Sequence, residues 1–169
     1  MKVTSAYANK LLKQLEEEKE YWLSKERESC LYTVSVGEEP VIPDYDFTEV
    51  DSQIRAIDQK ICRVKHAVNR SNAAAEIPVG NEVMSADVIL VRMAQLNKRK
   101  ATLDHMRKQL PKARVEETFG ARKAVPEYRY VNYDLETVRA EYEAVSQQVM
   151  DMQMALDKYN QTVEFELDL

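Results

Sequence analysis

Residues that interrupt regular backbone structure are scarce in this chain of 169 residues, which has three glycines and five prolines. Glycine weakens a helix because its backbone is so free, and proline breaks one because it has no N–H group. Methionine, leucine, glutamate, glutamine, lysine and alanine are instead plentiful. This composition argues against disorder over most of the length and favours an elongated, helical, single domain over 1–169.

Cysteines and long apolar runs are also scarce. Cys30 and Cys62 lack the paired spacing of a zinc site and the density of a disulfide scaffold, so we interpret them as reduced structural thiols. No window approaches the roughly 18 uncharged apolar residues of a membrane helix. The first residues, Met-Lys-Val-Thr-Ser-Ala-Tyr, lack the apolar core of a secretory signal. We therefore expect a cytoplasmic protein with no membrane partner.

The sequence contains no recognised catalytic or metal-binding motif. Neither His66 nor His105 follows a glutamate by three positions, which excludes the Glu-x-x-His pairs of ferritin-like di-metal bundles. HExxH, phosphate-loop, GxGxxG and nucleophile-elbow motifs do not occur. Both histidines lie in basic segments, where a solvated or structural histidine is the simplest interpretation. We expect a protein that is not an enzyme and holds no metal and no cofactor.

Charge is unevenly distributed along the chain, although the net charge is only -5. Residues 60–114 carry 12 Lys or Arg against 4 Asp or Glu, whereas 1–59 carry 7 against 13 and 115–169 carry 5 against 12. One interpretation is that basic and acidic helices lie side by side and neutralise each other at solvated faces. The other is an anion-binding surface in the middle third.

Two stripes of apolar residues repeat in steps of three and four, the spacing of a packing helix. The first stripe consists of Phe47, Val50, Ile54, Ile57, Ile61, Val64 and Val68. The second consists of Leu135, Val138, Tyr142, Val145, Val149, Met152, Leu156, Tyr159 and Val163. Such heptad stripes indicate coiled-coil-like packing between helices.

Four helices of similar length are predicted, and matched lengths favour an elongated antiparallel bundle in an all-α fold. Their expected ranges are 5–28, 47–72, 85–110 and 134 onward. Thr4 or Ser5, the pair Thr48 and Asp51, and Ser85 are the expected N-terminal caps.

Two segments outside the helices are expected to be extended. The segment 31–45 alternates with period two and breaks at Gly37, which predicts a small β-arm or hairpin. The segment 115–133 is predicted to be an extended, tyrosine-rich connection.

A candidate ligand site follows from the bundle arrangement. In an up-down-up-down bundle, Asn69, Asn72, Arg92 and Asn160 share one pole, and Arg99 follows on the third helix. One interpretation of the asparagines is helix capping. The other is a pocket for a small anionic, nucleotide-like ligand, since the planar guanidinium of arginine can bind two phosphate oxygens at once.

A second candidate surface lies in the tyrosine-rich connection. Tyr128, Arg129, Tyr130 and Tyr133 are predicted to form a subunit contact, because tyrosine is enriched at interfaces. A base-stacking platform is disfavoured, since the acidic total opposes nonspecific attraction to phosphate backbones and no nucleic-acid-binding motif is present.

Several short motifs over 47–166 together resemble a known family. They are Asn69-Arg70-Ser71-Asn72, Gly80, Arg92, Arg99, Arg129, Leu156-Asp157 and Asn160-Gln161-Thr162-Val163-Glu164. With these motifs the segment resembles the septicolysin-like family of small bacterial helical proteins. The resemblance implies an α-helical homo-oligomer, plausibly a ring, with no established chemistry. We discount the pore-forming activity that the family's label suggests, because neither an export signal nor an amphipathic span is found.

Three functions remain open from the sequence. The first is a non-enzymatic bacterial protein that associates with itself through the heptad stripes and the β-arm. The second is a binding or sequestering module for a small anionic ligand at helix poles or between subunits. The third is a coiled-coil adaptor whose partner is another protein.

Overall fold

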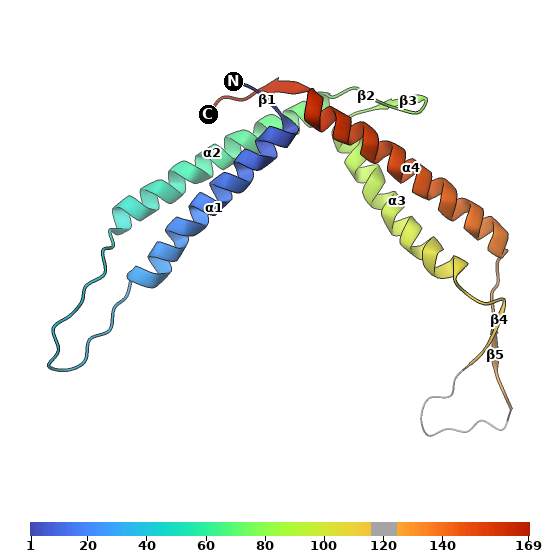
Figure 1. The fold of residues 1–169 in the computed structure, drawn as a ribbon, viewed down its shortest axis with the longest axis horizontal. Coiled ribbons are helices and arrows are strands. Elements are labelled where there is room, and N and C mark those ends of the chain that lie inside the picture. Colours follow the sequence, from blue (N-terminus) through green and yellow to red (C-terminus); the bar gives the residue numbers. More distant parts are fainter. Residues whose placement is uncertain (116–124) are drawn as a thin grey trace. The chain divides into compact units, whose positions relative to one another are not determined.

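The computed structural model describes residues 1–115 and 125–169, and this part of the chain is mostly helical with short antiparallel strand pairs (Figure 1). The helices are α1 (Ser5–Ser29), α2 (Phe47–Ala74), α3 (Ala86–Arg107) and α4 (Leu135–Thr162). The strands are β1 (Lys2–Thr4), β2 (Ile77–Val79), β3 (Glu82–Met84), β4 (Lys112–Arg114), β5 (Tyr128–Tyr130) and β6 (Glu164–Glu166). The predicted helical class, the four helices and the presence of a small β component are confirmed.

The chain divides into two compact units. The terminal unit comprises Met1–Ala75 and Asp157–Leu169, and the central unit comprises Glu76–Leu156. Helix α4 contributes residues to both units, because its last turns belong to the terminal unit. No helix among residues 1–115 and 125–169 is long and apolar enough to cross a membrane.

The terminal unit consists of the α1–α2 pair, closed at one end by the strands β1 and β6 (Figure 1). Its core combines the inner faces of both helices with one residue from each chain end. The buried residues of this core are Val3, Ala8, Leu15, Ile57, Val64 and Leu167. Burying such aliphatic side chains contributes about 1.5–3 kcal/mol each, which holds the helix pair together.

The pairing of the two chain ends was not predicted from the sequence. The amino group of Met1 donates to the carbonyl of Leu167 over 2.7 Å, and the Leu167 N–H donates back to the carbonyl of Met1 over 2.8 Å. Val3 then lies opposite Phe165 in the antiparallel register. Because strands this short are marginal alone, their side chains gain stability by packing on the helical core.

The central unit contains α3, most of α4, the hairpin β2–β3 at one end and the pair β4–β5 at the other (Figure 1). Its core joins Leu103 of α3 with Val138 and Val145 of α4. Tyr133 and Tyr142 pack against this cluster. The heptad stripe of α4 is therefore its inner face, as its spacing predicts.

Helix caps agree with the sequence in part. Thr4 accepts from the N–H of Tyr7 over 3.2 Å and caps α1, as predicted. Helix α2 is capped by Asp46, whose carboxylate accepts from the N–H of Glu49 over 2.9 Å, so the expected Thr48–Asp51 capping box is wrong. Ser85 occupies the N-cap position of α3, but its hydroxyl contacts Asp87 instead of a backbone amide.

The expected β-arm over 31–45 contains no strand. The segment is an exposed loop that leaves the end of the α1–α2 pair and returns to it (Figure 1). The predicted reversal does occur, because Gly37 has φ +92° and the N–H of Glu38 donates to the carbonyl of Ser35 over 3.1 Å. The period-two pattern fails to produce a strand here because, in the described part of the chain, no second strand lies beside this segment.

The connection between α3 and α4 is partly extended, as the sequence predicts. Helix α3 ends at Arg107, three residues earlier than expected, and the chain then forms β4. Strand β5 lies within the predicted tyrosine-rich segment 115–133. The prediction for residues 116–124 lies outside the described residues.

Candidate functional site

The residues of the predicted ligand site belong to different units. Asn69 and Asn72 lie near the end of α2 and Asn160 near the end of α4, all in the terminal unit, whereas Arg92 and Arg99 lie on α3 in the central unit. The Asn72 side-chain oxygen is buried without a hydrogen-bond partner among the described residues. The up-down-up-down pole that motivated this set is thus not formed within either unit, and the site stays a prediction.

Arg92 is held by the β2–β3 hairpin of its own unit. Its guanidinium donates to the Glu82 carboxylate over 2.7 Å and contacts the Met84 sulfur at 3.2 Å. A shallow pocket of about 390 Å³ beside it is lined also by Asp151 of α4. An anion that bound Arg92 would have to displace Glu82 and approach a second carboxylate, so this position is poorly suited to phosphate.

A larger groove in the terminal unit, of about 720 Å³, has a basic wall. Arg63, His66 and Arg70 recur on α2 with the spacing of one helix face and line the groove. None of these three side chains has a hydrogen bond or ion pair to another described residue. The opposite wall includes the carboxylates of Glu166 and Asp168. This groove was not predicted from the sequence, where the helical spacing of residues 63, 66 and 70 was the one pattern that could have indicated it.

A hydrogen-bonded pair fixes the groove wall at Ser71. The hydroxyls of Ser71 and Tyr159 lie 2.7 Å apart, and the Tyr159 hydroxyl is 3.0 Å from the backbone carbonyl of Ser71. Tyr159 is itself buried, so the contact joins α2 to the last turns of α4 within the terminal unit.

The β4–β5 pair presents one basic and aromatic face. The N–H of Val115 donates to the carbonyl of Glu127, and that of Val131 to the carbonyl of Pro111. Antiparallel pairs alternate between bonded and non-bonded positions, so in this register the non-bonded positions are Lys112 opposite Tyr130 and Arg114 opposite Tyr128. These four side chains therefore share one face, which we call the hairpin face.

Contacts within the hairpin face agree with that register. The Lys112 ammonium lies 4.3 Å from the ring centroid of Tyr128 and 5.5 Å from that of Tyr130. Both rings are largely exposed, Tyr128 by 47% and Tyr130 by 61%. Of the predicted interface residues, Arg129 points to the opposite face with Ala113, and Tyr133 packs into the core, where its hydroxyl donates to the carbonyl of Met106 over 2.9 Å.

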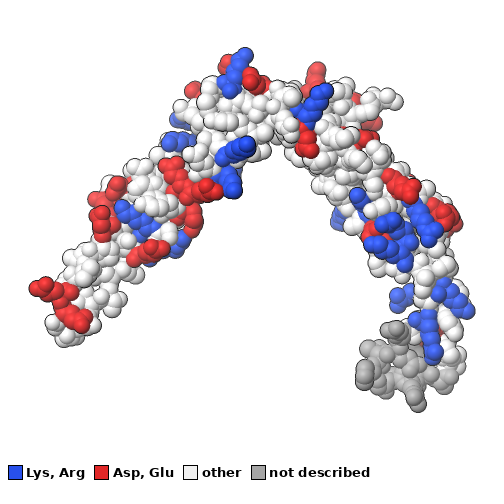
Figure 2. Space-filling model, in the orientation of Figure 1, with Lys and Arg blue, Asp and Glu red and all other residues white. Residues whose placement is uncertain are grey.

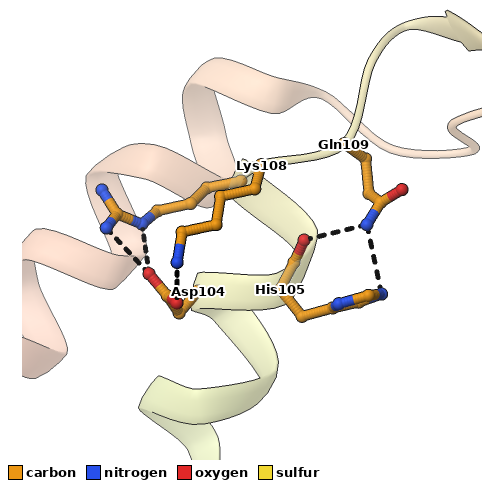
Figure 3. Close-up of polar contacts among 5 residues, drawn as sticks. Asp104, His105, Lys108 and Gln109 are labelled. Atoms are coloured by element: carbon orange, nitrogen blue, oxygen red, sulfur yellow. Dashed lines mark hydrogen bonds and ion pairs between the residues drawn. The ribbon is translucent and has the colours of Figure 1, made fainter.

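The end of α3 next to this hairpin is held by a charged cluster (Figure 3). Asp104 accepts from the Arg107 guanidinium over 2.8 Å and also contacts the Lys108 ammonium. These hydrogen bonds, from Lys108 first and then from Arg107, hold the pKa of the Asp104 carboxyl below its ordinary value. Arg107 also lies 3.9 Å from the ring centroid of Tyr142, which links the helix end to α4.

The loop 31–46, which we call the arm, is the most exposed apolar segment described. Leu31 is 82% exposed, Val36 106% and Val41 91%. At its base, the Tyr45 hydroxyl donates to Glu26 over 3.3 Å. Partial desolvation, followed by the charge of Glu26, raises the pKa of Tyr45. The arm is thus anchored at its base and leaves its apolar side chains in solvent.

The fold defines an α-helical protein built from helix pairs with short antiparallel strand pairs at their ends. One solved structure has a similar fold over the whole chain. It is described as a functionally unknown conserved protein from Corynebacterium diphtheriae, with a TM-score of 0.67, 14% sequence identity, and coverage of 98% of this chain and 100% of the other. Neither a family model nor a curated protein matches this sequence.

The charged cluster at Asp104 generates a prediction for pH dependence. Since the folded-state pKa of Asp104 lies below its unfolded value, its contribution to stability is present above about pH 4, the ordinary pKa of aspartate, and is lost as the pH falls through the lower folded-state pKa. Replacement Asp104→Asn should lower Tm slightly at pH 7, and this difference should vanish in acid. Thermal unfolding followed by circular dichroism measures it.

The matched control is Asp44→Asn in the arm, because Asp44 has no ion pair among the described residues. That variant should leave Tm unchanged at both pH values. An Asp104→Asn variant whose Tm differs from the wild type equally at neutral and acid pH would contradict the assignment.

Proposed function

We propose that the protein is a non-enzymatic, cytoplasmic helical scaffold that associates with itself, with the arm as its main contact. The observation that carries this proposal is the exposure of the arm's apolar side chains. They are Leu31, Tyr32, Val34, Val36, Val41 and Ile42, each at least 40% exposed. Single exposed apolar residues are ordinary, but a contiguous exposed group of them is typical of an interaction site.

The backbone of the arm supports the same proposal. Among residues 31–45, the described structure contains one backbone hydrogen bond, which the N–H of Glu38 donates. The remaining N–H and C=O groups are available, and the period-two apolar pattern fits a strand that is half-buried against a partner. An arm of this kind gains both hydrogen bonds and apolar burial when a second copy provides a surface for it.

Helix packing between copies offers a second set of contacts. Val88 and Val91 of α3, and Met150 and Met154 of α4, are exposed apolar side chains at helical spacing. Two helix pairs from two copies would together form an antiparallel four-helix bundle with coiled-coil-like packing. The bundle expected from the heptad stripes is thus proposed to be completed by assembly.

The triple variant Leu31→Ser, Val34→Ser and Val36→Ser should impair assembly while leaving the helices folded. Each aliphatic side chain contributes about 1.5–3 kcal/mol when fully buried, so even partial burial of three predicts an association constant about 100-fold weaker or more. Native mass spectrometry and sedimentation velocity over a concentration series measure the subunit count. Circular dichroism checks the helices.

The control is Val83→Ser, which removes an exposed valine outside the arm. It should assemble like the wild type. A wild-type protein that stays monomeric at all concentrations, or a triple variant with unchanged assembly, would contradict the proposal. A monomeric chain that forms a stoichiometric complex with a different protein would instead favour the adaptor function.

As a second candidate function we propose the binding of a small anionic, nucleotide-like ligand in the terminal-unit groove. The residues that support this proposal are Arg63, His66 and Arg70. Their side chains share one helix face and have no partners among the described residues. The Glu166 and Asp168 carboxylates on the opposite wall would repel an anion, so the proposed ligand is compact and contacts only the α2 wall.

Isothermal titration with ATP tests this second function and its location. Arg70→Ala should weaken binding about tenfold or more, because a hydrogen bond to a charged group contributes about 1.5–3 kcal/mol. Arg92→Ala is the comparison variant and should leave the affinity unchanged. The reverse order would favour the originally predicted residues, and no binding to the wild type would contradict a role for ATP-like ligands.

A further inference from the structure

We propose that the acidic arm of one copy docks on the hairpin face, Lys112, Arg114, Tyr128 and Tyr130, of a second copy. This inference rests on the proposed self-association and names its two surfaces. The arm and the hairpin face are different parts of the chain, so each copy would carry both surfaces. Such a contact is heterologous, and repeated contacts of this type form a ring when the rotation closes.

Charge complementarity is the first argument. No lysine or arginine occurs between Arg27 and Arg55, whereas Glu38, Glu39 and Asp44 lie in the arm. Glu38 and Glu39 have no ion pair among the described residues. On the hairpin face, Lys112 and Arg114 have no ion pair to any of the described residues. Figure 2 shows acidic side chains at the tip of the arm and basic ones over β4 and β5.

The available hydrogen-bonding groups are the second argument. Because Lys112 and Arg114 occupy non-bonded positions opposite β5, their backbone N–H and C=O groups point away from β5. They point to the edge of β4 that has no neighbouring strand in the described part of the chain. Apart from the bond between Glu38 and Ser35, the backbone groups of the arm make no backbone hydrogen bond in the described structure. Addition of the arm as a third strand would satisfy both sets of groups.

Side-chain chemistry is the third argument. Tyr32, Val34 and Val36 alternate, so in a strand they fall on one face. A strand added at the β4 edge lies directly beside Lys112 and Arg114, whose aliphatic stems can pack against such side chains. The exposed tyrosine rings of β5 lie one strand further along the same face. Opposite-charge cross-strand pairs stabilise a sheet, and the basic groups lie in reach of the following Glu38 and Glu39.

Two other docking sites for the arm fit less well. The terminal-unit groove has a basic wall, but an arm long enough to fill the groove would also meet the carboxylates of Glu166 and Asp168. Pairing of two arms would bring the Glu38 and Glu39 carboxylates of both copies close together, again with like charges facing. Among the described residues, the hairpin face has no carboxylate that would repel the arm.

A charge-exchange experiment tests the docking, with native mass spectrometry and sedimentation velocity as readouts. The arm variant is Glu38→Lys with Glu39→Lys, and the hairpin variant is Lys112→Glu with Arg114→Glu. Each alone places like charges at the contact, so its association should weaken at least tenfold. An equimolar mixture should form 1:1 alternating assemblies, and a chain carrying all four changes should again assemble alone.

The control is Lys60→Glu with Lys98→Glu, which changes the net charge by the same amount as the hairpin variant. Both lysines are exposed, and their side chains have no ion pair among the described residues. It should assemble like the wild type. If the hairpin variant lost its fold by circular dichroism, Lys112→Gln with Arg114→Gln would replace it, with the same expected loss of assembly.

The outcomes separate this inference from the proposed function. A wild type that is monomeric overturns both. A wild type that assembles while the hairpin variant assembles equally well overturns the docking and leaves self-association intact. Loss of assembly in both variants without recovery in the mixture also overturns the docking, because it shows that the two surfaces do not meet each other.

Discussion

A pair of helices can bury one apolar stripe from each partner, and this constraint shapes both units of the molecule. In the terminal unit the stripe runs through Leu15, Ile57 and Val64, and in the central unit through Leu103, Val138 and Val145. Much of the remaining helix surface among the described residues is exposed. The cores are therefore narrow, and several apolar side chains outside the stripes, such as Val88 and Met154, stay exposed.

The strand pairs compensate for these narrow cores at the helix ends. β1 and β6 add Val3, Phe165 and Leu167 to the α1–α2 core and tie the two ends of the chain together. In the central unit, β4 and β5 close the end that lies beside the cluster at Asp104. Among the described residues each pair has two strands and leaves open edges, which natural proteins cover, shorten or charge. Lys112 and Arg114 charge the edge of β4 in this way. Their positive charge also favours an acidic partner at that edge.

The helices could be predicted from the sequence because their signal is local. The stripes around Ile57 and Val145 fix both the period and the buried face, and few glycines or prolines interrupt them. The strand pairing of Lys2–Thr4 with Glu164–Glu166 could not be predicted, since segments of three residues carry almost no periodicity and the pairing joins opposite ends of the chain.

The candidate site was predictable in even smaller part. Arg92 lies next to Glu82 only because the β2–β3 turn brings the two together, which spacing alone does not reveal. Tyr128 and Tyr130 are exposed, and their predicted role in a subunit contact stays a prediction, whereas Tyr133 is half-buried because its ring packs against the central core. The groove residues Arg63, His66 and Arg70 repeat at helical spacing, yet their significance depends on the facing strand β6.

Hydrogen–deuterium exchange of the arm at two protein concentrations tests the central claim most directly. Within one chain, the amides of residues 31–36 have no backbone hydrogen bonds and should exchange at the rates of an unstructured peptide. If the arm docks on a second copy, these amides should be protected at concentrations where the multimer forms and lose that protection on dilution. Fast exchange at both concentrations, with the multimer present by native mass, would contradict the account.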